Sequence, residues 1–209
     1  MLAKSLHKLP SSRSFNTLIR AAILLFAPLL FSQSIHAHWS LDNDASKLSF
    51  VTVKADHVGE VHTFDVLSGS IGDAGEVEII IELASVNTMI PIRNERMQAM
   101  LFETNMFPKA TITGTVDIEA LAGLDAGEMQ TLQLEIELSL HGDSIQLMAD
   151  LLITRLTEGL VATTLKPIMV NAGSIGLVSG IEKLREVAGL PSISSAVPVS
   201  FTVVFAQGH

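Results

Sequence analysis

Residues 132–153 read LQLEIELSLHGDSIQLMADLLI, in which apolar and polar side chains alternate on both sides of a short break. Alternation with a period of two is typical of a β-strand that buries one face. The break at residues 141–143 reads HGD, which is the composition of a tight turn between paired strands. The segment therefore predicts an antiparallel hairpin whose apolar face includes Leu134, Ile136 and Leu138.

The same alternation recurs elsewhere in the chain, between turns rich in Gly and Asp, at residues 48–54, 77–83, 110–118 and 197–205. Residues 92–102 and 179–188 instead place apolar side chains at helical spacing. Ser179 and Gly189 are suited to begin and end the second of these helices. About eight strands and two short helices predict a mainly all-β domain, either an antiparallel barrel or a sandwich. The pattern alone does not choose between the two.

The first 37 residues have the features of a secretory signal peptide. Basic residues precede an apolar run at residues 21–31, which is shorter than the roughly 20 residues of a spanning helix. Ala37 is a small residue at the expected cleavage position. We therefore expect residues 1–37 to be removed on export, leaving one domain, residues 38–209.

Cleavage would remove four of the 13 Lys and Arg residues and none of the 22 Asp and Glu residues. The mature chain would then carry a net charge of −13, which argues against nucleic acid and anionic lipid head groups as partners. The chain has no Cys, so disulfides, thiol chemistry and a lipoprotein-type anchor are not expected. We expect no stable membrane anchor, and the sequence leaves open whether the protein forms a homodimer.

Several short motifs then resemble those of YceI-like proteins, in the same order and with similar spacing across residues 39–205. They are LSFV at 48–51, LASVNT at 83–88, RNERM at 93–97, LFETNMFP at 101–108 and VPVSF at 197–201. The resemblance implies a lipocalin-like, eight-stranded antiparallel β-barrel partly covered by one or two short helices. It also implies a lumen that holds an isoprenoid-like apolar chain, of the polyprenyl phosphate or isoprenoid quinone type. The family shares no catalytic residues, so the resemblance implies a binding protein and no enzyme. Many relatives are periplasmic, so it also implies a location in the periplasm.

The candidate ligand-binding residues are the inward-facing apolar side chains together with two methionines of the first helix, since flexible Met side chains adapt to irregular shapes. They are Phe50, Phe64, Ile112, Leu134, Ile136, Leu138, Phe201, Val203, Met97 and Met100. A close-packed core would use the same residue types, so the pattern does not separate a lumen wall from ordinary packing.

A phosphate head group would need cationic donors, and Arg93 and Arg96 lie three residues apart on the predicted first helix. Pairing with neighbouring acidic residues is the alternative role for both. A quinone head group would need only neutral hydrogen bonds, which Thr52, Asn87 or Thr88 could supply.

Two other interpretations remain open. His57, Glu60 and His62, with His38 at the expected mature N-terminus, could bind a metal, although their spacing fits neither one helix face nor one strand face. A non-lipid interaction module is the other interpretation, and no residue pattern favours it. We expect no cofactor beyond a bound isoprenoid lipid or isoprenoid quinone, and no resident metal.

Overall fold

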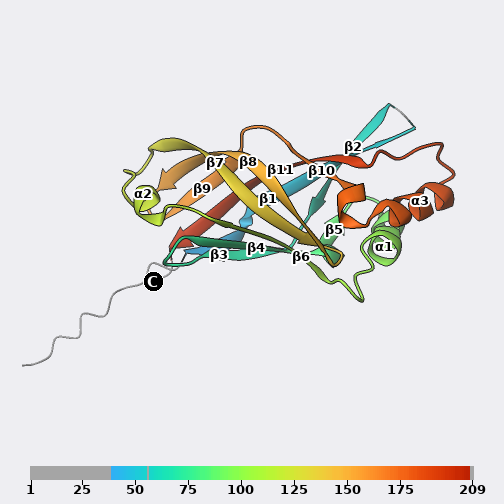
Figure 1. Ribbon diagram of the computed structural model, residues 1–209, viewed down its shortest axis with the longest axis horizontal. Coiled ribbons are helices and arrows are strands. Elements are labelled where there is room, and N and C mark those ends of the chain that lie inside the picture. Colours follow the sequence, from blue (N-terminus) through green and yellow to red (C-terminus); the bar gives the residue numbers. More distant parts are fainter. Residues whose placement is uncertain (1–38, 56, 208–209) are drawn as a thin grey trace, which may run out of the picture. The chain divides into compact units, whose positions relative to one another are not determined.

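The computed structural model describes residues 39–55 and 57–207. The predicted signal peptide (1–37) and His38 lie outside these residues. The described part of the chain forms one compact unit that is built mostly of β-strands (Figure 1). No helix within it is long and apolar enough to cross a bilayer.

Eight antiparallel strands close into a barrel. They are β1 (Trp39–Lys54), β3 (Leu67–Ile71), β4 (Glu76–Glu82), β6 (Lys109–Thr115), β7 (Met129–Leu140), β8 (Asp143–Leu156), β9 (Gly159–Thr164) and β11 (Ala196–Gln207). Their order around the barrel is β1-β3-β4-β6-β7-β8-β9-β11, and pairing of β11 with β1 completes the ring. Closure removes free strand edges, which an open sheet would expose. This confirms the lipocalin-like barrel and excludes the sandwich.

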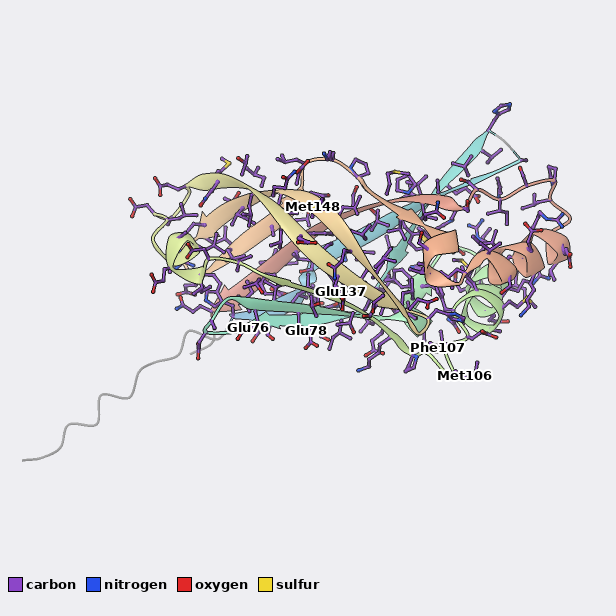
Figure 2. The ribbon with its side chains drawn as sticks, in the orientation of Figure 1. Glu76, Glu78, Met106, Phe107, Glu137 and Met148 are labelled. Carbon is purple, nitrogen blue, oxygen red and sulfur yellow. The ribbon has the colours of Figure 1, made fainter. Side chains whose placement is uncertain are left out.

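The predicted hairpin at residues 132–153 is formed by β7 and β8, with Leu140 opposite Asp143. His141 and Gly142 both adopt positive φ angles, 56° and 89°, which suit a two-residue turn between twisted strands. Alternation separates the two faces, and Ile136 is buried in the lumen. The labelled side chains Glu76, Glu78 and Glu137 project from the outer face of the barrel in Figure 2.

One end of the barrel is extended by three shorter strands and covered by helical segments. The strands are β2 (Val58–Phe64), β5 (Val86–Asn87) and β10 (Ile168–Asn171). The helical segments are α1 (Pro91–Arg96), which continues into the π-helical turn η2 (Met97–Leu101), and α3 (Val178–Val187). Figure 1 shows α1 and α3 at this end and α2 (Ile118–Ala122) at the other. Two 3-10 turns, η1 (Leu83–Ser85) and η3 (Ala172–Ile175), complete the elements.

Two boundary predictions were wrong. The strand expected over residues 110–118 ends at Thr115, and Ile118 begins α2 because the Asp117 side chain accepts the Ala120 N–H and caps a helix there. Ser179 does not begin α3, since its N-cap is Leu177, whose side chain cannot accept a hydrogen bond. Gly189 does follow the end of α3, with the positive φ of 64° that glycine tolerates.

The end of the barrel near α2 is filled by side chains. Trp39, Leu160 and Phe205 are each at most 2% exposed. The Arg155 guanidinium lies 4.7 Å from the centre of the Trp39 ring, and its Nη1 donates to the Gly159 carbonyl. This packing closes one end of the lumen.

At the other end, α3 packs directly against η2. A Cβ atom at Gly180 would lie 2.8 Å from both the Leu101 Cα and the Met100 carbonyl oxygen, closer than real Cβ atoms approach. Only a glycine at position 180 allows the two helical segments this close approach.

We expect Gly180→Ala to lower the free energy of unfolding by about 1–3 kcal/mol, because the added methyl must push α3 away from η2. Helix propensity alone would favour Ala by roughly 1 kcal/mol, so a loss isolates the steric effect. Urea unfolding followed by circular dichroism measures the change. The matched control is Gly59→Ala in β2, where an added Cβ meets nothing within 4 Å. Equal or greater stability of Gly180→Ala would contradict the packing described here.

Candidate functional site

Between the packed end and the helices lies a cavity of about 350 Å³. This volume is within the range of small-molecule sites, which are roughly 300–1,000 Å³. Of the 36 residues that line the cavity, 29 are apolar, so it suits a ligand that is largely hydrocarbon. Strands β1, β2, β4, β6, β7, β8, β10 and β11 contribute to its wall, and α1, η2 and α3 cover it.

The structure brings nine of the twelve candidate residues together on this cavity. They are Phe50, Phe64, Arg93, Arg96, Met97, Ile112, Ile136, Leu138 and Phe201. Ile136 and Leu138 come from β7 and Phe201 from β11, strands that are not neighbours in the barrel. The closed barrel therefore brings residues that are far apart in the sequence to the wall of one lumen.

The other three candidates, Leu134, Val203 and Met100, do not line the cavity. Val203 is 1% exposed in the core that packs around Phe205, and Leu134 lies opposite Ala149, which is fully buried. Met100 is half-buried on η2, whose Met97 and Leu101 face the cavity instead. Alternation predicts which face of a strand points inward, but it does not predict how far along the barrel the open space extends.

Several lining residues were not singled out as candidates from the sequence. Ile181 and Leu184 of α3 line the cavity, and they belong to the apolar helix face that the sequence does predict. Ala172 and Ile175 of η3 line it too, although no pattern points to them. Glu60 and His62 also face it.

Polarity increases along the inner face of β1 and β2. The paired residues are Leu48 with Phe64, Phe50 with His62, and Thr52 with Glu60. Residues directly opposite each other on antiparallel strands point to the same side of the sheet, so each pair faces the lumen together. The wall thus changes from apolar, through aromatic and imidazole, to ionic.

An ionic cluster forms the polar end of this series. Glu60 Oε2 lies 2.7 Å from both Lys54 Nζ and Arg93 Nη1. Arg93 Nη2 also donates to the Thr88 carbonyl at 2.6 Å. The hydrogen bond from Lys54, aided by Arg93, holds the pKa of the Glu60 carboxyl below its ordinary value against the opposing effect of burial. Arg93 is therefore held at the cavity by Glu60 of β2 and by the Thr88 carbonyl, which lies shortly before α1.

His62 lies one step deeper and is only 3% exposed. Its Nε2 is 2.9 Å from Thr52 Oγ1, and its ring is 5.3 Å from the ring of Phe50. Burial lowers the pKa of the imidazole below its ordinary 6.5, and the positive charge of Arg93 lowers it further. His62 is therefore a neutral polar group within an aromatic wall.

The candidate metal ligands do not gather. His57 is exposed near the turn between β1 and β2, whereas His62 is buried in the lumen, and His38 lies outside the described residues. Within residues 39–55 and 57–207, no three His, Asp or Glu side chains are placed to hold a metal ion together.

The lowered pKa of His62 makes stability depend on pH. As the pH falls through 6.5, the unfolded chain binds a proton at this histidine before the folded chain does, so the free energy of unfolding falls as the pH decreases. This contribution amounts to at most about 1.4 kcal/mol per pH unit. We expect His62→Gln to reduce the loss of stability between pH 7.5 and 5.5, measured by urea unfolding at each pH.

The control for this experiment is His57→Gln, whose side chain is exposed and leaves the Thr52 contact intact. It should keep the pH dependence of the unmodified protein. Identical pH dependence of the unmodified protein and His62→Gln would show that burial does not shift the titration of His62.

Comparison with known proteins agrees with this architecture. The model of the YceI-like domain matches residues 39–205. No curated protein sequence matches the chain. A solved structure of a polyisoprenoid binding domain from Saccharophagus degradans, implicated in plant cell wall breakdown, is 42% identical with a TM-score of 0.81. That alignment covers 83% of this chain and 100% of the other.

Two more distant structures share the fold. BcnA from Burkholderia cenocepacia is 16% identical with a TM-score of 0.61, over 78% of this chain and 98% of its own. A mutant CJ YCEI protein with a monobromobimane guest is 15% identical with a TM-score of 0.51, over 71% of this chain and 84% of its own. The family match spans nearly all of the described residues, and the chain therefore belongs to the YceI-like domain family.

Proposed function

We propose that this protein binds an isoprenoid-like apolar chain in its barrel cavity and carries, stores or protects that chain in the periplasm, without catalysing a reaction. The observation that carries the proposal is the cavity itself, which is apolar along most of its wall and has one ionic and hydrogen-bonding cluster at one end. A molecule with a long apolar tail and a small polar head has the same distribution of polarity.

The physical basis for holding a chain ligand is removal of apolar surface from water, at roughly 25 cal/mol per Å² buried. Ile112, Ile136 and Leu138 supply aliphatic wall, and the Phe50, Phe64 and Phe102 rings follow one another with centroids 5.3 and 5.7 Å apart. Such a wall binds hydrocarbon without directional bonds, so it tolerates a flexible chain. The polyisoprenoid binding domain from Saccharophagus degradans, at 42% identity, supports an isoprenoid as that chain.

The cluster at the polar end is suited to a head group of polyprenyl phosphate or quinone type. Arg93 and Arg96 both line the cavity and could contact a phosphate. Among the neutral candidates, Thr52 lines the cavity, whereas Thr88 Oγ1 donates to Asn94 Oδ1 and Asn87 Nδ2 donates to Asp65. Thr52 is therefore the better placed of the three for a quinone head group.

We expect protein purified after export in a bacterial host to retain an isoprenoid lipid, detected by organic extraction and mass spectrometry. Ala110→Phe should reduce the retained lipid about tenfold or more. Ala110 lines the cavity opposite Ile81 and is 2% exposed, so a phenyl group there occupies space that a ligand would need.

The matched control is Thr113→Phe, which puts the same ring on the exposed outer face of β6. It should retain lipid as the unmodified protein does. Thermal melts establish that both variants fold. Absence of lipid from the unmodified protein, or equal retention by Ala110→Phe, would contradict the proposal.

Export is tested separately by cell fractionation and intact-mass analysis of the full chain produced in a Gram-negative host. We expect the protein in the periplasmic fraction with residues 1–37 removed, so that His38 is the first residue, because the basic and apolar segments at residues 1–31 have signal-peptide character. Substitution of Ala37 by Glu should block cleavage and leave the longer form. A full-length cytoplasmic product from the unmodified gene would refute export.

A further inference from the structure

The cavity opens to the outside between the start of α1 and the end of α3. Of the described residues that line the cavity, three are exposed to solvent, namely Ile90, Ile92 and Ala188. A residue that lines a cavity and is also exposed lies at its opening. All three side chains are apolar, so the rim of the opening is hydrocarbon. Figure 1 shows α1 and α3 together at this end of the barrel.

Further exposed apolar residues extend this rim. Met89 and Val187 directly precede two of the rim residues in the chain. Val58 lies directly opposite Lys54, which lines the cavity, on the paired strand. Single exposed apolar residues are normal on a protein surface, whereas a group of them around a cavity opening is typical of a contact surface. The mouth surface is defined here as Val58, Met89, Ile90, Ile92, Val187 and Ala188.

Met89 projects furthest from the fold, with 86% of its surface exposed. Its φ angle of 62° lies in the left-handed region, which residues other than Gly, Asn and Asp rarely adopt. Side chains hold the turn in this shape, because Asn87 Oδ1 accepts the Met89 N–H and Asn94 Oδ1 accepts the Thr88 N–H. Backbone strain of this kind is concentrated at functional sites. A long apolar side chain held in water by a strained turn indicates a contact outside the fold.

The charge of the protein is distributed unevenly with respect to this opening. The segments around it, residues 54–60, 89–101 and 178–190, contain five Lys or Arg and five Asp or Glu, so they carry no net charge. The rest of the expected mature chain contains four Lys or Arg and 17 Asp or Glu. The whole net charge of −13 therefore lies outside the segments that surround the mouth.

A neutral, apolar surface on a strongly acidic protein limits the kind of partner. A second copy carries the same −13 and repels the first, and an anionic lipid surface repels the acidic body in the same way. A zwitterionic bilayer has no net charge, and its hydrocarbon begins just below the head groups, within reach of a shallow apolar surface. Long apolar chains also dissolve in a bilayer, so a mouth seated on it lets such a chain enter the cavity without crossing water.

We propose that the mouth surface docks reversibly on a zwitterionic lipid bilayer, with the opening of the cavity toward the hydrocarbon. Ile90 and Ile92 enter the lipid from the start of α1, and Val187 and Ala188 enter it from the end of α3. The inference goes beyond the proposed function, because it assigns a partner to the outside of the barrel. It rests on that function only for the reason to dock, which is exchange of the bound chain.

The experiment is flotation of the exported protein with phosphatidylcholine vesicles at low ionic strength. Intact mass first confirms removal of residues 1–37, because the apolar run at residues 21–31 would bind vesicles by itself. We expect half of the protein to float at about 1 mM lipid, which is weaker than binding through a single acyl anchor. Replacing about 30% of the lipid by phosphatidylglycerol should weaken the binding, because the acidic body is then repelled.

Two matched variants locate the contact. Met89→Glu should raise the lipid concentration for half binding about tenfold or more, because an ionised carboxylate is unfavourable in apolar surroundings. The control is Met148→Glu, which puts the same charge on the outer face of β8, away from the mouth, where Met148 is 50% exposed (Figure 2). It should float as the unmodified protein does. Thermal melts establish that both variants fold.

Three results would overturn the proposal. The first is failure of the unmodified protein to float at about 10 mM phosphatidylcholine, or equal flotation of Met89→Glu. The second is stronger binding to the vesicles that contain phosphatidylglycerol, which would indicate an electrostatic contact instead. The third is self-association without vesicle binding, seen by sedimentation velocity and abolished in Met89→Glu, which would assign the mouth surface to a second copy.

Lipid retention by the same preparation separates this inference from the proposed function. Protein that retains an isoprenoid but does not float would remove the docking surface and leave chain binding standing. Protein that floats but retains no lipid would leave the docking surface standing and contradict the proposed function.

Discussion

Strands β1 and β11 come from opposite ends of the domain, and their backbone pairing closes the barrel. Trp39–Asp42 and Lys47–Phe50 pair with β11, and an irregularity separates the two runs. Ser46 links β1 to β11 at this irregularity, because its hydroxyl accepts the Val204 N–H at 3.0 Å while the side chain is only 2% exposed. A slip of one residue would turn every inward side chain of β1 outward. Closure and register are thus fixed together.

Strand β1 then continues past the closed ring of eight strands and forms part of the cavity wall. β1 pairs with β2 from Leu48 to Lys54, whereas its pairing with β11 ends at Phe50, so the extension beyond the ring carries Thr52 and Lys54. Backbone contacts hold the hairpin in place, since Ala55 N donates to Ser192 O and Ser194 N donates to Val53 O in the segment after α3. The position of the ionic cluster relative to the lumen therefore depends on the pairing that closes the barrel.

Sequence reasoning predicted the inward faces well and the extent of the lumen poorly. Period-two alternation placed Ile136, Leu138 and Phe201 on the inner face because side-chain direction is a local property of an extended chain. Whether a position such as Val203 meets open space or the packed Trp39 end depends on partners distant in sequence. The choice of barrel over sandwich likewise depends on the β1–β11 pairing, which no local pattern encodes, and it came from the family resemblance.

The ionic cluster of Lys54, Glu60 and Arg93 shows the same limit of sequence reasoning. His62 and Glu60 drew attention as metal ligands because of their residue types and short spacing. Their role in the lumen depends on Arg93, which lies 33 residues beyond Glu60 and reaches it only through the placement of α1. Spacing along the chain could not reveal a partner brought in by tertiary structure.

A half-buried ionic cluster is weak evidence for stability, because removing charges from water offsets most of their attraction. Apolar residues in place of Lys54, Glu60 and Arg93 could pack beside an apolar cavity without that desolvation. The cluster instead makes the two ends of the cavity chemically different, with the Ile136 wall favouring hydrocarbon and the His62 end favouring a polar atom. A uniformly apolar lumen would accept a chain in either direction. For the chain ligand proposed above, the graded wall of β1 and β2 favours one direction, with the polar head at the ionic end and the tail toward the packed end.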